Sequence, residues 1–225
     1  MTFKVLKRKI VNTYKRLNEN EKMHIKIAKR NAKRLRNKDF SLIARNCVGG
    51  VMCHDVGVEF KSPTINLWIP NKDYIVFLKD LKSYLTADMT FLRDDEKDVP
   101  YPVGVLFSGR EEVRIYFMHY KTNEDALEKW RERASRVNFD NLFVLFQDLD
   151  GCEYEDLVEF DKLPYKNKVA LVHKEYPEIK SAFVIKGLTG DHPGEMLDYI
   201  KDYSGKKFYD QFPYVDWFNG KNIFK

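Results

Sequence analysis

The sequence predicts an α/β protein, with a mixed sheet, flanking helices and a basic helical N-terminal arm. From residue 39 onward, short apolar runs typical of buried strands alternate with amphipathic helical segments, which is the pattern of the α/β class. Two of these runs, residues 103–107 and 113–118, are joined by Ser-Gly-Arg-Glu-Glu, a normal hairpin connection that makes the predicted sheet mixed. Residues 1–38 are strongly basic and have a helical pattern. We therefore expect two parts, an amphipathic arm at 1–38 and an α/β domain at 39–225.

The arm is expected to form two helices. Apolar residues recur at three- and four-residue steps from Leu6 to Leu17, with Lys and Arg between them. Asn18-Glu-Asn20 interrupts this pattern, and Asn20 is a suitable N-cap for a second helix over residues 21–35.

The remaining elements follow from apolar pattern and capping signals. Leu142-Phe-Val-Leu-Phe146 is fully apolar and predicts a central strand. Thr122 is the expected N-cap of a helix that begins at Glu124. The tail after residue 207 is rich in aromatic residues and is expected to pack against the domain. The predicted strands are 40–44, 65–69, 103–107, 113–118, 142–146, 168–173 and 181–185; the predicted helices are 73–86, 124–138, 153–160 and 195–203, with a short helix or turn at 48–54.

Composition excludes several classes of protein. The chain has 225 residues, of which 44% are hydrophobic and 14% aromatic, so it has enough apolar side chains for a core and is not disordered. No apolar run approaches the ~20 residues that cross a membrane, and no apolar signal core follows the basic N-terminus. Three cysteines make no disulfide framework. We expect a cytoplasmic protein with reduced thiols.

Charge is divided unevenly along the chain. Residues 1–38 hold 14 Lys and Arg against two acidic residues, a net charge of +12. Since the whole chain has a net charge of +5, the other 187 residues have a net charge of 5 − 12 = −7. The arm either docks on the domain through its apolar stripe or lies on an anionic membrane surface, which would place the protein at the inner face of the membrane. Nucleic acid is not expected as a partner, because the acidic domain contains no recognised binding module.

A cysteine follows the first predicted strand. The run at 40–44 stops at Asn46-Cys47, and Gly49-Gly50 come directly afterward. Ligands of open α/β sheets bind at the carboxyl ends of strands, so Cys47 is the candidate centre of the site. We expect helix N-terminal amides to lower its pKa and the glycines to admit a substrate close to the backbone.

Two more predicted strands end in reactive side chains, His119 and Asp148. A thiol, an imidazole and a carboxylate are the parts of a nucleophilic relay, in which Cys47 attacks, His119 moves the proton and Asp148 orients the ring. The alternative is structural: a buried cysteine, a hydrogen-bonded histidine and a capping aspartate.

Two places in the sequence contain residue types that can bind a metal. Cys53-His54-Asp55 contains ligand types, but adjacent residues seldom point at one ion and no second ligand pair is present, so no metal is expected there. Asp148-Leu-Asp150 is the pattern of paired carboxylates that hold a divalent cation and a nucleotide sugar in some glycosyltransferases. Acidic turn residues explain the same pattern equally well.

The chain resembles a known bacterial family. The resemblance is carried by Asn46-Cys-Val-Gly-Gly50, His54-Asp55, Ser62-Pro-Thr-Ile-Asn66, Tyr101-Pro-Val-Gly104, Trp130-Arg-Glu-Arg133, Gln147-Asp-Leu-Asp-Gly-Cys152 and Leu163-Pro-Tyr-Lys166. The chain resembles the family of domains of unknown function numbered 1919 over about residues 40–219. Members of that family are often labelled exopolysaccharide or capsule biosynthesis proteins. The resemblance implies a setting in surface-polysaccharide assembly and no particular reaction. The family often has an aromatic residue at the position of Val48. A looser likeness, to papain-like families, rests on Phe117-Met-His-Tyr120 followed by Trp130-Arg-Glu-Arg133, and is analogy only.

These observations favour a transferase in cell-surface polysaccharide synthesis, with acyl transfer through Cys47 as the first hypothesis and a polysaccharide precursor or activated donor as its partner. The alternatives are a nucleotide-sugar-dependent glycosyltransferase and a non-enzymatic scaffold at the membrane surface. The sequence assigns no cofactor. The predicted catalytic residues are Cys47, His119 and Asp148, and the predicted substrate-binding residues are Asn46, Gly49, Gly50, His54, Asp55, Arg131, Arg133 and Asp150.

Overall fold

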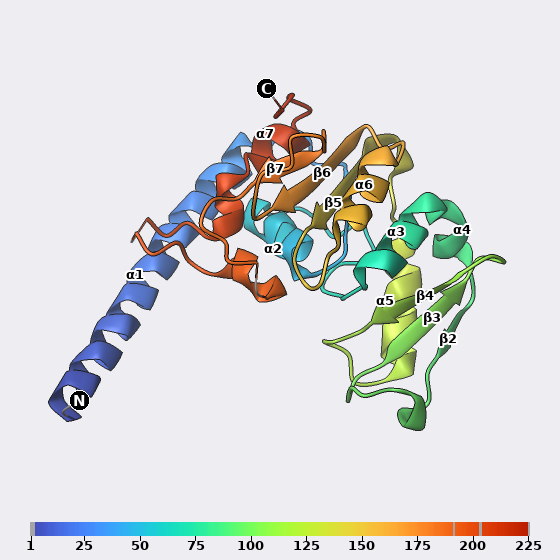
Figure 1. Cartoon of the computed structure of the whole chain (residues 1–225), viewed down its shortest axis with the longest axis horizontal. Helices are drawn as coiled ribbons and strands as arrows, with labels where there is room; N and C mark the ends of the chain where they lie inside the picture. The colour runs from blue at the N-terminus through green and yellow to red at the C-terminus, as the bar shows by residue number, and fades with distance from the viewer. Residues whose placement is uncertain (1–2, 191, 203, 225) are drawn as a thin grey trace.

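Seven helices and seven strands form two sheets with helices around them in the computed structural model, which describes residues 3–190, 192–202 and 204–224 (Figure 1). The helices are α1 (Phe3–Arg34), α2 (Cys47–Val56), α3 (Asn71–Lys79), α4 (Leu81–Thr86), α5 (Asn123–Ala134), α6 (Tyr154–Lys162) and α7 (Tyr214–Phe218). The strands are β1 (Ser41–Ala44), β2 (Met89–Phe91), β3 (Val103–Phe107), β4 (Glu112–Tyr116), β5 (Leu142–Gln147), β6 (Asn167–Val172) and β7 (Ala182–Val184).

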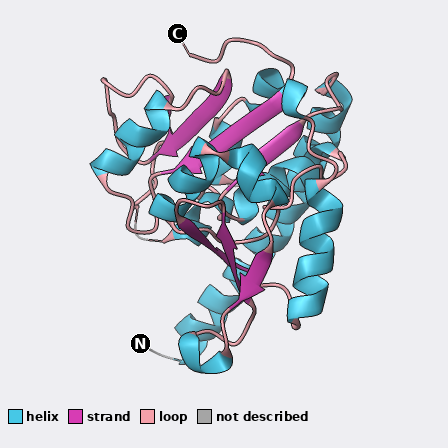
Figure 2. Ribbon diagram, turned by 90° about the vertical axis from the view of Figure 1, so that its right-hand side faces the viewer, coloured by secondary structure: helices cyan, strands magenta, loops and turns pink. Residues whose placement is uncertain are grey.

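The α/β class is confirmed, and parallel and antiparallel strands occupy separate sheets (Figure 2). The larger sheet has the order β1-β5-β6-β7 and is parallel throughout; the smaller has the order β2-β3-β4 and is antiparallel. The prediction of one mixed sheet required the hairpin to join the parallel strands. The hairpin instead lies in a separate sheet. The burial patterns explain the division, because β4 alternates exposed and buried residues whereas β5 is buried on both faces.

Two hydrophobic clusters cover the two faces of the parallel sheet. Ile43 points into the cluster that α3 and the antiparallel sheet share, while Leu42 and Ala44 point into the one that α2 and the C-terminal aromatics share. The predicted packing of the aromatic tail is confirmed, since Phe212 and Trp217 are among the buried residues of the second cluster. The site-bearing edge of the sheet is thus held from both sides.

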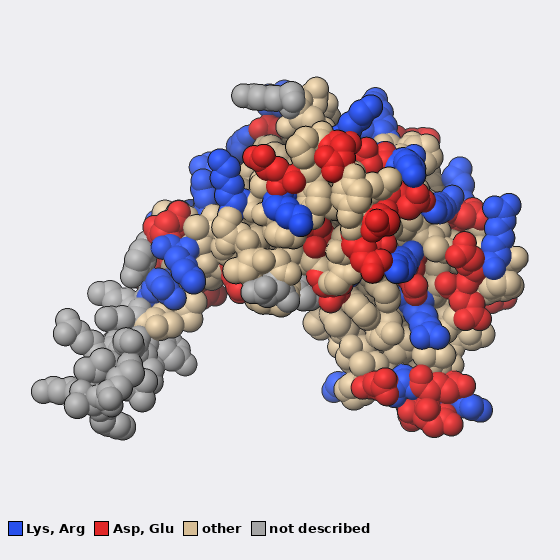
Figure 3. All heavy atoms as spheres, in the orientation of Figure 1, with Lys and Arg blue, Asp and Glu red and all other residues tan. Residues whose placement is uncertain are grey.

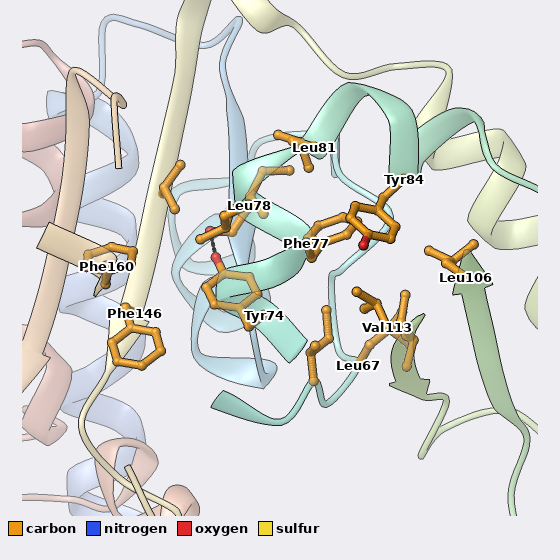
Figure 4. Packing of buried hydrophobic residues seen from close by; sticks show 14 of the residues in the cluster. Leu67, Tyr74, Phe77, Leu78, Leu81, Tyr84, Leu106, Val113, Phe146 and Phe160 are labelled. Atoms are coloured by element: carbon orange, nitrogen blue, oxygen red, sulfur yellow. Dashed lines mark hydrogen bonds between the residues drawn. The ribbon is translucent and has the colours of Figure 1, made fainter. Parts of the chain in front are cut away.

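Helix α3 joins the two sheets. The Tyr74 hydroxyl donates to the carbonyls of Ile43 (2.9 Å) and Leu145 (3.1 Å), which lie on two neighbouring parallel strands. Figure 4 shows Tyr74 and Phe77 on this helix. Phe77 of the same helix is fully buried in the cluster that contains Val113 of the antiparallel sheet. The helix predicted over 73–86 is divided at Asp80, whose ψ of 52° is not helical.

The N-terminal segment is one helix, so the predicted interruption at Asn18–Asn20 is wrong. Asn20 caps nothing; it is buried in the middle of α1, where its side-chain oxygen accepts a hydrogen bond from Gly205 N–H (3.3 Å). Asn31 of α1 likewise donates to the Tyr214 hydroxyl (2.9 Å). Contacts with the C-terminal segment thus satisfy polar side chains that would otherwise disfavour helix. The N-terminal end of α1 extends away from the rest of the molecule (Figure 1).

Two other predicted elements are absent. Residues 65–69 make only an isolated bridge between Trp68 and Tyr116 instead of a strand. Residues 195–202 of the helix predicted over 195–203 are not an α-helix, and Tyr203 lies outside the described residues. A short 3₁₀ turn, Pro193–Leu197, is followed by an antiparallel bridge between Tyr199 and Lys207. Among the described residues, no helix combines the length and the hydropathy needed to cross a membrane.

Candidate functional site

Cys47 is the first residue of α2, at the point where the first parallel strand has ended. Asn46 is the N-cap of that helix: its side-chain oxygen accepts from Val48 N–H (3.1 Å), and its amide donates to the Gln147 side chain (2.7 Å). Gln147 is the last residue of β5, so the cap is also tied to the neighbouring strand. Cys47 is half-buried, and its backbone is fixed by these two bonds.

His119 reaches Cys47 from the other sheet. It follows β4 by three residues, and its Nε2 lies 3.6 Å from Cys47 Sγ. The two residues are 72 positions apart in the chain, and the packing of α3 against both sheets brings them together. The structure thus joins two of the three predicted catalytic residues in the arrangement of a nucleophile and its base.

Asp148 does not belong to this pair, which corrects the predicted relay. Its two carboxylate oxygens accept from the backbone N–H of His173 (3.0 and 3.1 Å), and His173 Nδ1 lies 2.7 Å from one of them. Asp148 follows β5 and His173 follows β6, the adjacent strand, whereas His119 belongs to the antiparallel sheet. Burial raises the pKa of Asp148, and the bonds from His173 oppose that rise.

The predicted lowering of the Cys47 pKa is also wrong. Burial raises the pKa of the thiol, and the backbone N–H at the helix start offsets this only in part. A cysteine of this kind rests as the thiol and becomes a nucleophile when an adjacent base takes its proton. His119 Nε2 is in position to be that base.

A cavity of about 360 Å³ opens beside Cys47. Its walls are mostly apolar, with the Cys47 thiol and two polar side chains among them. The lining residues are Asn46, Cys47, Val48, Trp68, Tyr101, Met118, Asp150, Gly194 and Leu197. Small-molecule sites commonly have this character, with apolar walls and a few placed polar groups.

Asp150 is held at the edge of this cavity by three donors from two segments, Arg45 and residues 68–71. Its Oδ2 accepts from Arg45 Nη2 (2.9 Å) and from Trp68 Nε1 (2.5 Å), and its backbone carbonyl accepts from Asn71 Nδ2 (2.9 Å). Asp150 has φ of 66°, a left-handed conformation that is uncommon for residues other than glycine. Sequence reasoning missed Arg45 and Trp68: Arg45 directly precedes Asn46, but nothing in the sequence links Trp68 to Asp150.

Comparison with known proteins places the chain in a family. The family model described as a domain of unknown function (DUF1919) matches residues 18–219. The chain belongs to the DUF1919 family. It is also similar to a protein of Haemophilus influenzae described as uncharacterized, with 41% identity over 188 residues that make up 83% of this chain and 87% of the relative. The residues that the family model matches include Cys47 and His119, the cavity lining and the second half of α1, so part of the basic arm belongs to the DUF1919 domain.

The two glycines after Cys47 serve packing in this DUF1919 domain, not substrate approach. A Cβ on Gly49 would lie 2.5 Å from the Cβ of Ala44 in β1, and a Cβ on Gly50 would overlap the side-chain oxygen of Asn66. Both glycines are buried. They let α2 lie directly against the sheet and the 65–66 loop, which sets the position of Cys47 at the helix start.

The predicted binding residues His54 and Asp55 lie at the far end of α2. The His54 side chain is 81% exposed. Asp55 is buried beside α1, where it is 3.0 Å from His24 Nε2 and accepts a hydrogen bond from the Tyr209 hydroxyl. Neither residue lines the cavity beside Cys47.

The predicted arginines also lie outside the cavity. Arg131 is exposed on α5 and is 3.9 Å from Asp88. Arg133 donates to the Tyr120 hydroxyl (3.2 Å) and stands over the Phe60 ring. Arg133 therefore supports the segment next to His119 without reaching the site itself.

No group of three or more His, Cys, Asp and Glu side chains with a metal-binding arrangement occurs in the part of the chain that the structure describes. Asp148 and Asp150 bind separate partners, His173 and Arg45 respectively. Their carboxylates therefore lack the shared geometry that a cation bridging a nucleotide sugar needs.

Proposed function

We propose that this DUF1919 domain is a transferase that moves an acyl group through Cys47, with His119 as general base. One observation carries the proposal: Sγ and Nε2 lie 3.6 Å apart beside an apolar cavity. Nucleophile and base at this separation form the minimal unit of covalent catalysis, and such contacts tighten when substrate binds. The cavity supplies the apolar walls that an acyl chain prefers to water.

The chemistry proceeds in two steps. His119 Nε2 takes the Cys47 proton as Sγ attacks the carbonyl carbon of an activated acyl donor, and the protonated imidazole then returns the proton to the leaving group. The acyl thioester on Cys47 is next attacked by an acceptor whose proton passes to His119. Collapse of that intermediate expels Sγ, which recovers its proton. Bonds and protons balance without another reactant.

The setting proposed for this reaction is the synthesis of cell-surface polysaccharide, with a precursor or activated donor as substrate. It is supported by the resemblance of the chain to proteins that carry that label. The alternative, glycosyl transfer from a nucleotide sugar, needs Asp148 and Asp150 to share a cation, and both carboxylates already accept hydrogen bonds from other groups. The acyl-transfer hypothesis is therefore the better supported one.

We also propose that α1 lies on an anionic membrane surface. Lys26, Lys29 and Lys33 are exposed on this helix, together with Leu17 and Ile25. Lys and Arg side chains project from the described part of α1 with an acidic group between them, and both charge signs are interspersed over the rest of the visible face (Figure 3). Each Lys near an anionic surface contributes about 1 kcal/mol. A K26E/K29E/K33E variant should not sediment with phosphatidylserine vesicles that pellet the wild-type chain; equal pelleting would reject the membrane contact.

Covalent trapping tests the acyl transfer. The full chain is mixed with p-nitrophenyl butyrate, and the butyryl adduct is located by intact-mass and peptide spectrometry. An adduct on Cys47 that is lost in Cys47→Ala supports the proposal. Cys152→Ala is the matched control, because Cys152 is also half-buried but lies outside the cavity lining. An adduct that persists unchanged in Cys47→Ala would reject the proposal.

A further inference from the structure

We infer that the cavity beside Cys47 binds a neutral, hydroxyl-rich acceptor, a sugar or another polyol, through the carboxylate of Asp150. The inference deepens the proposed function, because it names the class of molecule that receives the acyl group. Three features of the molecule carry it: the way Asp150 is held, the charge that faces it, and the walls around it.

Asp150 is held more firmly than a turn residue requires. Arg45 donates to it from one segment, Trp68 and Asn71 donate from a second, and its backbone is left-handed. Uncommon backbone conformations of non-glycine residues persist where the surroundings fix them, and they are concentrated at functional sites. Groups fixed in this way are ready to bind a ligand without reorganisation.

The two carboxylate oxygens of Asp150 differ in their hydrogen bonds. Arg45 and Trp68 both donate to Oδ2, and no hydrogen bond from the described residues reaches Oδ1. The Asp150 side chain is 26% exposed and lines the cavity, while the Arg45 side chain is only 1% exposed, so the carboxylate and not the guanidinium is the accessible member of the ion pair. An ionised carboxylate oxygen accepts hydrogen bonds from hydroxyl groups and forms some of the stronger ones in proteins.

The charge balance favours a neutral ligand. The guanidinium of Arg45 lies 2.9 Å from the carboxylate of Asp150 and is almost completely buried, so its positive charge offsets the negative charge of the carboxylate. A cation in the cavity would give up its hydration for a carboxylate that is already paired. A hydroxyl group keeps its hydrogen bond and brings no charge into an apolar cavity.

The walls match the rest of such a molecule. Trp68 and Tyr101 line the cavity, and aromatic rings pack against the C–H faces of sugar rings. Asn46 is the other polar group of the lining, but its oxygen and amide are already bonded to Val48 and Gln147. Transfer through a covalent intermediate lets the donor leave before the acceptor enters, so one cavity serves both.

The test observes Trp68 directly. The chain has three tryptophans, of which Trp130 and Trp217 are buried, so 5-fluorotryptophan labelling gives three ¹⁹F resonances with one at the cavity. Trp68→Phe assigns that resonance. The full chain is titrated with glucose, galactose, N-acetylglucosamine and glycerol, and separately with tetramethylammonium chloride.

At least one of the neutral probes is expected to shift the Trp68 resonance saturably. Asp150→Asn should weaken that binding by roughly 10- to 100-fold, because it removes a charged acceptor. Asparagine tolerates the left-handed backbone, and Tyr101→Ala provides a second lesion that leaves the ion pair intact and should also weaken binding. Phe107→Ala is the control, since Phe107 is exposed on β3 outside the cavity and should not change the affinity.

The inference is overturned if all four neutral probes leave the Trp68 resonance in place, if only tetramethylammonium moves it, or if Asp150→Asn binds as tightly as the wild type. The mass-spectrometric assay for the Cys47 adduct separates this result from the proposed reaction, because the sugar titration contains no acyl donor. Sugar binding without a Cys47 adduct would reject acyl transfer and keep the binding site.

Discussion

Each end of α2 holds one residue that pairs with a histidine, and the surroundings of the two pairs differ. Cys47 at the start of the helix pairs with His119, and Asp55 near its end pairs with His24. At the N-terminal end, Cys47 is half-buried and faces one exposed imidazole beside a cavity. At the other end, Asp55 is buried and bound by His24 (3.0 Å) and the Tyr209 hydroxyl, and His24 also lies 3.6 Å from Asp210. The Cys47–His119 pair therefore adjoins open space, whereas Asp55 and His24 are surrounded by protein groups that already pair with them.

The comparison separates a site from a structural junction. Buried charges that are fully paired fix elements to one another, and here they join α1, α2 and the C-terminal segment. A thiol with one exposed partner and an adjacent cavity is arranged to meet something that is not protein. Substitutions at the two ends should therefore have opposite effects on stability and on reactivity.

The largest change in stability is expected from Asp55→Ala. It leaves His24 and Tyr209 buried without their acceptor, and loss of one partner of a buried pair costs about 3–5 kcal/mol. Urea unfolding at pH 7 measures this, with Cys47→Ala at the other end of α2 expected to change the free energy of unfolding by less than about 1 kcal/mol. Equal losses for the two variants would remove the distinction between the ends.

The pH dependence of stability should follow the same junction. Burial lowers the pKa of His24, but hydrogen bonds to Asp210 and Asp55 outweigh burial and raise it to about 9. Because this folded-state pKa lies above the usual 6.5, the stabilisation is complete below pH 6.5 and is lost as the pH rises through 9. The loss is on the order of 3 kcal/mol.

Urea titrations between pH 6 and pH 9.5 check this dependence, with His24→Gln as the variant that should flatten it. The other titratable groups that face His24 are Asp55, Asp210, Tyr209 and Tyr199. Hydrogen bonds from His24 and Tyr209 outweigh burial and lower the pKa of Asp55, while burial raises the pKa of Tyr209 and of Tyr199, so these three groups keep their charge over that interval. A wild-type curve that matches the variant would show that His24 is not charged in the folded protein.

A smaller loss is expected from Gly49→Ala, which tests how the N-terminal end of α2 is positioned. The added methyl group would press on Ala44, and overpacking of this kind costs about 1–3 kcal/mol. Since alanine favours helix by up to about 1 kcal/mol, an unstrained site would instead become more stable. Thermal unfolding of the variant gives the sign of the change, and an increase would contradict the packing role of the glycine.

The smallest effect on reactivity is expected from Asp148→Asn. Asp148 binds His173, so its loss should lower stability by about 1 kcal/mol while the rate of Cys47 acylation changes less than twofold. The acylation rate is followed by p-nitrophenolate release. A large loss of rate would restore Asp148 to the relay that the sequence predicted.

The sequence predicted most of the fold because apolar patterns are local. The runs at 40–44 and 142–146 form β1 and β5, and their continuous hydrophobic character reports burial on both faces of a parallel sheet. The failures are tertiary in origin. Asn20 remains in a helix because Gly205, far along the chain, satisfies its side chain, and no local rule contains that contact.

The candidate site was predicted in part for the same reason. That Cys47 and His119 both follow strands is visible in the sequence, and the structure places them 3.6 Å apart. The partner of Asp148 depends on strand order, which the sequence does not show. Asp148 follows β5, and β6 lies next to β5 while β4 lies in another sheet, so Asp148 pairs with His173 and not with His119. The importance of Arg45 follows only from burial and pairing with Asp150.

The most direct test compares the rate at which p-nitrophenyl butyrate acylates Cys47 in the wild type and in His119→Gln at pH 7. A general base contributes about 10²- to 10⁴-fold, so loss of the imidazole should slow acylation by roughly 100-fold or more, with the folded state retained. Equal rates in the two proteins would show that His119 does not activate Cys47, and the proposed nucleophile and base would be two neighbours without a shared function.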